Sequence, residues 1–311
     1  MESRPIILDC DPGHDDALAI TLALARPELH VLGITTVGGN SPLANTTRNA
    51  LRILALLGRS DVPVAAGAER ALLRENWIPV EFHGASGLDG ADLPEPEATP
   101  RAEGALALTE SLVAGAAQPV TLVATGPLTN VALLLRARPC VREGIDRICL
   151  MGGSLGEGNT TAAAEFNIWQ DPEAAAIVFG SGIPITMLGL DVTHRALFLE
   201  PDVARLEALG TRVARVWVDL LRFFAVYHRQ RYGWDGSPIH DAVAVAHLAV
   251  PGLVTTRLLR VDVETQGELT RGRTVADPEG LRGLPPNVDA GVDIDRERFV
   301  DLLVEAIASY G

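Results

Sequence analysis

The stretch IILDCDPGHDDALAI, at residues 6–20, carries four aspartates within eight residues: Asp9, Asp11, Asp15 and Asp16. Carboxylates this close repel one another, and His14 is the only basic side chain between them. Either water or a bound cation must therefore compensate the charge. The segment alone leaves more than one interpretation open, because a DxD motif also occurs in metal-dependent phosphotransferases and acidic residues also stabilise the first turn of a helix.

Polar residues and glycines follow other apolar runs of the sequence as well. The segments are TTVGGN (35–40), ATGPLTN (124–130), MGGS (151–154), GEGNTTAAAEFN (156–167), LDVTH (190–194) and PIHDA (238–242). Carboxylate and amide oxygens bind hard cations and sugar hydroxyls, and glycine lets a ligand approach the backbone closely. Taken singly, each segment is also compatible with a tight turn, a helix cap such as Asn130 or a solvated dipeptide such as His240-Asp241. Their recurrence favours a site for a metal and a polyol.

The elements that would position these residues alternate along the chain. Short β-rich apolar runs are separated by longer Ala/Leu-rich segments of helical period, and the runs are 5–8, 31–36, 120–124, 145–151, 184–190 and 258–263. This pattern predicts a single-domain α/β fold over residues 1–311, with a mostly parallel, doubly wound sheet and helices on both faces. Ligands bind at the carboxyl ends of such strands, where the polar segments lie. One helix is predicted over 41–57, with Ser41 as N-cap and Gly58 after its end.

The composition argues against several classes of partner. The net charge of −14, from 26 Lys plus Arg against 40 Asp plus Glu, disfavours nucleic acid and anionic membrane surfaces. No apolar stretch reaches about 18 residues and no signal peptide is recognisable, so neither a membrane span nor secretion is expected. The three cysteines, Cys10, Cys140 and Cys149, show neither zinc-site spacing nor a disulfide framework. We expect a cytoplasmic protein that binds a small neutral or cationic ligand.

Nine short motifs occur in a fixed order over nearly the whole chain: DCDPGHDDA, TVGGN, FHGASGLDG, ATGPLTN, MGG, AEFN, DPEAA, LDVTH and PIHDA. In this the sequence resembles the nucleoside hydrolase family of the inosine-uridine-preferring type, and the DxDPGxDDA opening is highly specific to that family. The resemblance implies an α/β domain that binds Ca²⁺ tightly and hydrolyses the N-glycosidic bond of ribonucleosides to free base and ribose by metal-activated water. It also implies a homo-oligomer, either a dimer or a tetramer.

The resemblance further implies roles for individual residues at the metal. The calcium ligands would be the side chains of Asp11, Asp16 and Asp241 and the backbone carbonyl of Thr125. Three carboxylates and a carbonyl, completed by water and sugar hydroxyls, suit the roughly six to eight oxygens that Ca²⁺ takes. Asp11 would also be the general base that draws a proton from the attacking water, and His240 the acid that protonates the departing base.

The same resemblance implies residues that hold the substrate. Asp15, Asn40 and Asn167 would bind the ribose 2′ and 3′ hydroxyls, Asn159 and Glu165 the 5′ hydroxyl, and His83 would face the nucleobase. Residues 223–236 are predicted to form a helix and a loop that close over the base, and no role is assigned to four side chains there: Tyr227, His228, Arg231 and Trp234. The choice between purine and pyrimidine, and the acceptance of deoxyribonucleosides, stay open.

Two other functions are compatible with the residues. A metal-dependent phosphohydrolase would use Asp9 or Asp11 as nucleophile, but it would require a Lys or Arg beside the phosphoryl group, and the strand-end segments contain neither. A non-catalytic nucleoside-binding or Ca²⁺-binding protein would hold ribose without turnover, yet it would have no use for His240.

Overall fold

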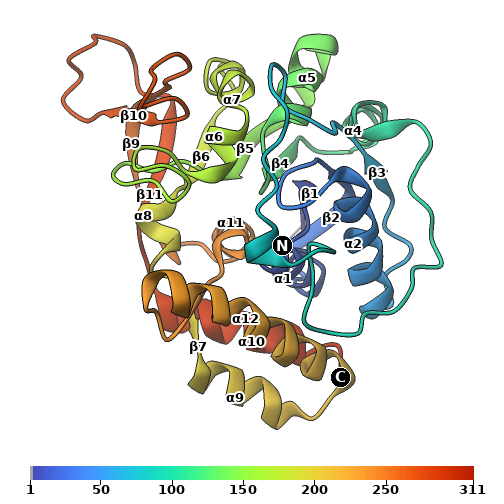
Figure 1. Ribbon diagram of the computed structural model, residues 1–311. Helices are drawn as coiled ribbons and strands as arrows, with labels where there is room; N and C mark the ends of the chain where they lie inside the picture. Colours follow the sequence, from blue (N-terminus) through green and yellow to red (C-terminus); the bar gives the residue numbers. More distant parts are fainter. Residues whose placement is uncertain (1–2) are drawn as a thin grey trace.

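A nine-stranded sheet runs through the computed structural model, which describes residues 3–311 (Figure 1). The strand order is β10-β9-β11-β6-β5-β4-β1-β2-β3. These strands are β1 (Arg4–Cys10), β2 (Leu29–Thr36), β3 (Val64–Ala66), β4 (Val120–Ala124), β5 (Ile145–Met151), β6 (Ile185–Leu188), β9 (Val254–Val263), β10 (Thr274–Asp277) and β11 (Val288–Ile294). A separate two-stranded sheet pairs β7 (Leu197–Leu199) with β8 (Gly236–Pro238).

Most of the large sheet is parallel. Neighbouring strands from β3 across to β11 all pair in parallel, whereas β9 is antiparallel to both β11 and β10. The central strands β1 and β4 are buried along almost their whole length, as expected for parallel strands covered on both faces. The structure therefore confirms the predicted single-domain α/β fold with a mostly parallel, doubly wound sheet. It adds an antiparallel edge, where β9 is only partly buried.

Helices cover both faces of this sheet (Figure 1). Helices α4, α5 and α7 pack over one apolar cluster, and α1, α2, α11 and α12 pack over the other. The helices are α1 (His14–Ala25), α2 (Leu43–Leu56), α3 (Val80–His83), α4 (Gly104–Gly115), α5 (Thr129–Ala137), α6 (Phe166–Gln170), α7 (Pro172–Phe179), α8 (Leu190–Thr193), α9 (Glu200–Leu209), α10 (Arg212–Tyr232), α11 (His240–Ala249), α12 (Arg296–Ala308) and the 3-10 helix η1 (Pro139–Gly144).

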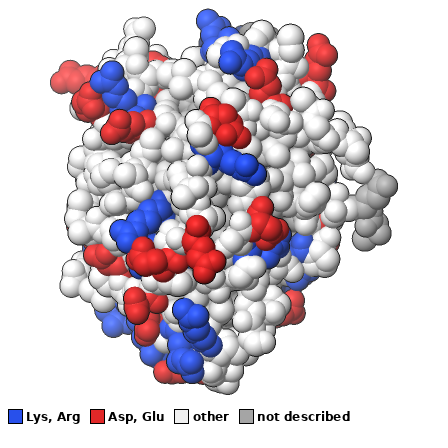
Figure 2. Space-filling view, turned by 90° about the vertical axis from the view of Figure 1, so that its right-hand side faces the viewer, with Lys and Arg blue, Asp and Glu red and all other residues white. Residues whose placement is uncertain are grey.

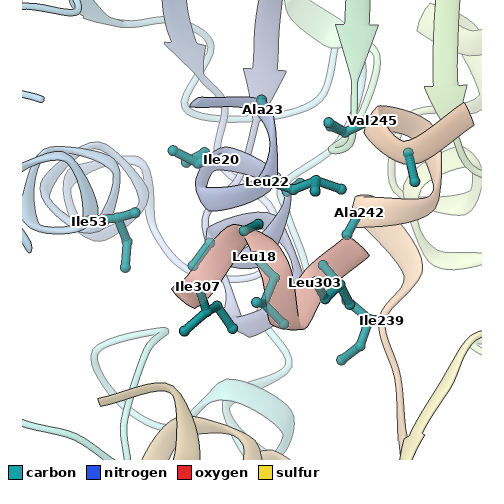
Figure 3. Close-up of a cluster of buried hydrophobic side chains, with 14 of the residues drawn as sticks. Leu18, Ile20, Leu22, Ala23, Ile53, Ile239, Ala242, Val245, Leu303 and Ile307 are labelled. Carbon is teal, nitrogen blue, oxygen red and sulfur yellow. The ribbon is translucent and has the colours of Figure 1, made fainter. Parts of the chain in front are cut away.

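Helix α1 lies in the interior of the protein. Every residue from His14 to Ala23 is buried, so this helix is apolar on all sides beyond its first turn, as interior helices are. Figure 3 shows its side chains Leu18 and Leu22 among residues of α11 and α12, including Ala242 and Leu303. Because α1 and α11 pack closely along each other, their N-terminal turns are held side by side. Both turns carry acidic residues.

Three local predictions need correction. The helix predicted from Ser41 begins at Leu43, because the Ser41 hydroxyl accepts from the side chain of Asn45 at 2.9 Å and caps no backbone N–H. The strand predicted over 184–190 ends at Leu188, since the next residues turn into α8. The strand predicted over 258–263 begins earlier, at Val254.

Charged side chains of both signs are interspersed over the face seen in Figure 2, with no extended basic patch. Within residues 3–311, no helix combines the length and the apolar character needed to cross a membrane.

Candidate active site

A cavity opens at the carboxyl ends of the parallel strands, the edge at which α/β sheets bind small ligands. Carboxylates and amides line its floor, and imidazoles and aromatic rings line its walls. The lining residues are Asp15, Asn40, Trp77, Pro79, Phe82, His83, Thr125, Met151, Asn159, Thr160, Glu165, Phe166, Asn167, His194, Phe224, His228, Tyr232, Trp234, His240 and Asp241. The described lining includes no Lys or Arg, which argues against a phosphoryl-transfer site.

Three carboxylates converge at the floor. Asp15 and Asp16 come from the first turn of α1, Asp241 comes from the first turn of α11, and one oxygen of each lies within 4.8 Å of the others. All three are buried. Burial raises the pKa of each, and the charges of Asp15 and Asp16 raise the pKa of Asp241 further. Such a cluster is stable only when a bound cation or bound protons compensate its negative charge.

Asp11 lies beside this cluster and is completely buried. Its Oδ2 accepts a hydrogen bond from the backbone N–H of Asn40 at 2.7 Å, whereas Oδ1 has no partner among the described residues. Burial, followed by the charge of Asp16, raises the pKa of Asp11 well above its usual range. Gly39 is required here, because a Cβ at this position would collide with the Asp11 carboxylate.

Asp16 is oriented by several hydrogen bonds. Its carboxylate accepts from the backbone N–H groups of Asp11 and Gly13 at 3.2 and 3.1 Å, and from the Thr125 hydroxyl at 2.8 Å. The backbone carbonyl of Thr125 accepts from the Asn167 amide at 2.8 Å. The cluster, the unpartnered Asp11 oxygen and this carbonyl form an all-oxygen donor set, which fits a hard divalent cation.

The amide side chains of the floor each keep an acceptor or donor for a ligand. Asn167 donates both amide protons to the backbone carbonyls of Thr125 and Met151, and its Oδ1 has no partner among residues 3–311. Asn40 donates its amide to Asp16 at 3.1 Å, which likewise leaves its side-chain oxygen without a partner in the described chain. These oxygens can accept hydrogen bonds from sugar hydroxyls.

Glu165 has a structural role that its sequence context did not reveal. Its carboxylate caps α6 by accepting from the backbone N–H groups of Asn167 and Ile168, and it also accepts from Gly153 at 2.8 Å. Burial raises the pKa of Glu165 to about 7. Asn159 lies next to it, and its Oδ1 accepts from the N–H of Phe166 at 3.0 Å. The amide protons of Asn159 have no acceptor in the described residues.

His240 lies on the wall, at the start of α11. Its Nδ1 is 2.7 Å from the hydroxyl oxygen of Thr193, and its ring meets the ring of His194 edge-on, with 5.6 Å between the centroids. Burial lowers the pKa of His240 well below its usual range, and the neighbouring histidines lower it further. Nε2 has no hydrogen-bond partner among residues 3–311, so it is available to a ligand.

His83 forms another part of the wall and is buried. Its Nδ1 lies 3.0 Å from Nδ1 of His14, whose Nε2 donates to the carbonyl of Asp89 at 2.8 Å. The His14 ring stacks on Phe224 with a centroid distance of 5.0 Å. The buried rings of His14 and Phe224 therefore fix the position of His83.

The segment 223–236 forms the end of α10 and the following loop, as predicted. His228 and Trp234 line the cavity with parallel rings 6.1 Å apart. Tyr227 packs on Phe82 instead, at 3.8 Å between centroids, and Arg231 is exposed outside the cavity. Sequence reasoning missed several wall residues: Trp77, Phe82, Phe166, His194, Phe224 and Tyr232.

The fold and the site are those of an N-ribohydrolase. Residues 6–301 match the family model described as inosine-uridine preferring nucleoside hydrolase, and the chain belongs to this family. It is 53% identical over 309 residues to a pyrimidine-specific ribonucleoside hydrolase RihA from Shewanella sp. (strain MR-7), covering 99% of this chain and 97% of that one. Identity to the enzyme of the same description from Enterobacter sp. (strain 638) is also 53%, over 98% of both chains.

Solved structures agree with this assignment. A purine-preferring ribonucleoside hydrolase from Gardnerella vaginalis superposes with a TM-score of 0.93 at 34% identity, over 99% of both chains. The resemblance drawn from the sequence motifs is thereby confirmed, and with it the prediction of a ribonucleoside hydrolase. The two RihA relatives are named as pyrimidine-specific, whereas the Gardnerella vaginalis enzyme is named as purine-preferring.

Proposed function

We propose that the chain is a Ca²⁺-dependent hydrolase of pyrimidine ribonucleosides, with residues 1–311 as one catalytic domain. The observation that carries this proposal is the buried, unpartnered Asp11 oxygen beside the Asp15, Asp16 and Asp241 carboxylates, at the floor of a cavity with His240 on its wall. A buried carboxylate oxygen without a partner costs about 1–3 kcal/mol, so a ligand or a proton at that oxygen would stabilise this arrangement.

Asp11, Asp16, Asp241 and the Thr125 carbonyl would hold the calcium ion. When bound, the ion would neutralise the clustered carboxylates and make a water molecule more acidic. Asp11 accepts the proton of the attacking water, and the Asn40 backbone N–H keeps its carboxylate in place. The water adds to the anomeric carbon on the face opposite the base, which gives the inverted ribose.

The remaining floor residues would hold the sugar. Asp15, Asn40 and Asn167 bind the 2′ and 3′ hydroxyls, because the two amide oxygens are free of protein donors. Asn159 and Glu165 bind the 5′ hydroxyl. Positive charge develops on the sugar ring as the glycosidic bond breaks, and the acidic floor stabilises that charge. His240 and His83 face the base, and His240 donates to it as it departs.

The choice of a pyrimidine base rests on the RihA relatives, whose identity of 53% exceeds the 34% of the purine-preferring structure. We expect kcat/KM for uridine and cytidine to exceed the values for inosine and adenosine by at least about tenfold, which corresponds to about 1.4 kcal/mol in the transition state. A reducing-sugar assay over these four nucleosides, extended to 2′-deoxyuridine, measures this. Equal or higher values for the purines would contradict the base preference, and no ribose release from any of them would contradict the hydrolase itself.

Removal of the metal gives a second test. Dialysis against EGTA should abolish uridine hydrolysis and lower the melting temperature, because four buried carboxylates then repel one another. Adding Ca²⁺ to about 100 times its dissociation constant should restore activity and raise the free energy of unfolding by about 2.7 kcal/mol. Calorimetric titration of Ca²⁺ into the dialysed protein measures calcium binding independently of activity. Full turnover in EGTA, together with no heat of binding, would refute the calcium site.

The proposal includes a cytoplasmic homo-oligomer, either a dimer or a tetramer. Cys10, Cys140 and Cys149 are unpaired, which suits a reducing compartment. Exposed apolar side chains near the antiparallel edge, including Leu258 and Leu281, suit contact with a second copy. Light scattering of the purified protein measures its oligomeric state.

A further inference from the structure

Thr193 lies against His240 but outside the lining of the cavity. It is the last residue of α8 and its side chain is completely buried. The hydroxyl oxygen is 2.7 Å from Nδ1 of His240, and this is its only hydrogen bond among residues 3–311. The backbone N–H of Thr193 donates to the carbonyl of Gly189 at 3.0 Å, so the backbone makes its own helical bond.

The proton on this hydrogen bond can be assigned by counting donors. A threonine hydroxyl has one proton, and within a helix it commonly donates to the carbonyl of the preceding turn. No such bond occurs within residues 3–311, where Nδ1 of His240 is the only acceptor for the proton of Thr193. If Nδ1 carried the proton instead, the buried hydroxyl proton would have no acceptor, at a cost of about 1–3 kcal/mol.

We propose that Thr193 is a positioning residue, which fixes His240 in the tautomer that carries its proton on Nε2. The Thr193 hydroxyl donates to Nδ1, and a neutral imidazole then has its single N–H at Nε2. That nitrogen has no protein partner in the described chain, and the ring lines the cavity. The inference rests on the proposed function, because only a departing base gives the orientation of this N–H a consequence.

The chemistry explains why the tautomer matters. When the N-glycosidic bond breaks, its electron pair stays with the base nitrogen, and in a pyrimidine the negative charge spreads onto the carbonyl oxygens. The Nε2–H of His240 donates a hydrogen bond to this anion and keeps its own N–H bond, so the interaction strengthens as charge develops. The released anion then takes a proton from solvent, and Asp11 returns the proton of the attacking water to solvent. The opposite tautomer would present a lone pair to the anion and repel it.

The tautomer can be observed directly. Long-range ¹H–¹⁵N correlation spectra of the ¹⁵N-labelled, Ca²⁺-loaded enzyme distinguish protonated from unprotonated ring nitrogens, and the spectrum of His240→Ala identifies the His240 signals. We expect a protonated Nε2 and an unprotonated Nδ1. A wild-type His240 with its proton on Nδ1 would overturn the inference, whether or not the enzyme hydrolyses nucleosides.

Kinetics give an independent test. Thr193→Val keeps the volume and removes the donor, and should lower kcat/KM for uridine by about 10²-fold, the size of effect expected when one hydrogen-bond donor to a developing anion is lost. It should lower kcat/KM for p-nitrophenyl riboside by less than about threefold, because that leaving group is stable as an anion. Thr193→Ser should restore most of the uridine activity. Equal losses on the two substrates, or no loss on uridine, would overturn the role of Thr193.

A matched control separates this effect from the loss of a buried hydrogen bond in general. Thr186 is also fully buried, in β6, and its hydroxyl accepts from Arg147 at 2.6 Å. Thr186→Val should therefore lose a comparable bond and keep both activities. A wild-type enzyme that releases no ribose from any nucleoside would refute the proposed function, while the spectra would still decide the tautomer.

Discussion

Replacement of Asp11 by asparagine should lower kcat for uridine by about 10³- to 10⁴-fold with little change in the fold. The amide can keep one oxygen toward the N–H of Asn40, where the carboxylate accepts at 2.7 Å. Its NH₂ would then replace Oδ1, the atom that has no protein partner and that would take the proton of the attacking water. Single-turnover ribose release and thermal melting of the variant measure the two effects separately.

Asp9 provides the matched control for this substitution. It is a buried aspartate two residues away whose Oδ1 accepts from Thr35 and Asn130, and its carboxylate lines a small second cavity. Its Oδ2, like Oδ1 of Asp11, has no partner among the described residues. Asp9→Asn should leave turnover within about threefold of wild type. Equal losses in both variants, or none in Asp11→Asn, would remove Asp11 as the base. A loss confined to Asp9→Asn would likewise contradict the assignment of Asp11 as the base.

The floor of the site was accessible to sequence reasoning because its signals are local. Asp11, Asp15 and Asp16 follow an apolar strand directly, and Asn40 and Thr125 follow the next strands in the same way. A parallel sheet brings such carboxyl ends to one edge, so the polar segments could be placed together without coordinates. The prediction that they form one site follows from the fold class.

The partnership of Asp241 with this floor could not be derived from spacing. It depends on the packing of α11 against α1, through small and branched side chains such as Ala242 and Leu22. Only the resemblance of the PIHDA motif to a known family placed Asp241 at the metal. The structure supplies the physical reason, since two interior helices are held side by side at their N-terminal turns.

The wall of the cavity was largely hidden from sequence reasoning. Phe224 and Tyr232 lie on α10, and their positions in this amphipathic helix are also compatible with a place in the core or on the surface. Trp77 lies in a loop, where no periodicity indicates its surroundings. Tyr227 and Trp234 could not be distinguished by sequence, yet the structure puts one against Phe82 and the other in the cavity.

The carboxylate of Glu165 shows how one residue can serve two purposes. It faces the cavity, and it also caps α6 through the backbone N–H groups of Asn167 and Ile168. Substitution by glutamine would place an amide donor against these N–H groups and disturb the helix that carries Asn167. The contribution of the 5′ hydroxyl is therefore better measured on the wild-type enzyme, by comparing uridine with 5′-deoxyuridine.

His247 provides a control for the replacement of His240, because both histidines lie on α11. His240 and His247 are the first-turn and last-turn histidines of α11, and only His240 lines the cavity. His247→Ala should keep the activity of the wild type on all substrates. Any loss in His247→Ala would measure damage to α11 rather than to the chemistry.

Against that control, His240→Ala should lower kcat/KM for uridine by about 10²- to 10⁴-fold, because the departing base loses the imidazole donor proposed to stabilise it. Hydrolysis of p-nitrophenyl riboside should change little, since p-nitrophenolate leaves without a donor. Adding Thr193→Val to His240→Ala should cause no further loss, because Thr193 acts through the His240 ring. Equal losses on uridine and p-nitrophenyl riboside would show that His240 shapes the site rather than assisting the base. Additive losses in the double variant would show that Thr193 acts by another route.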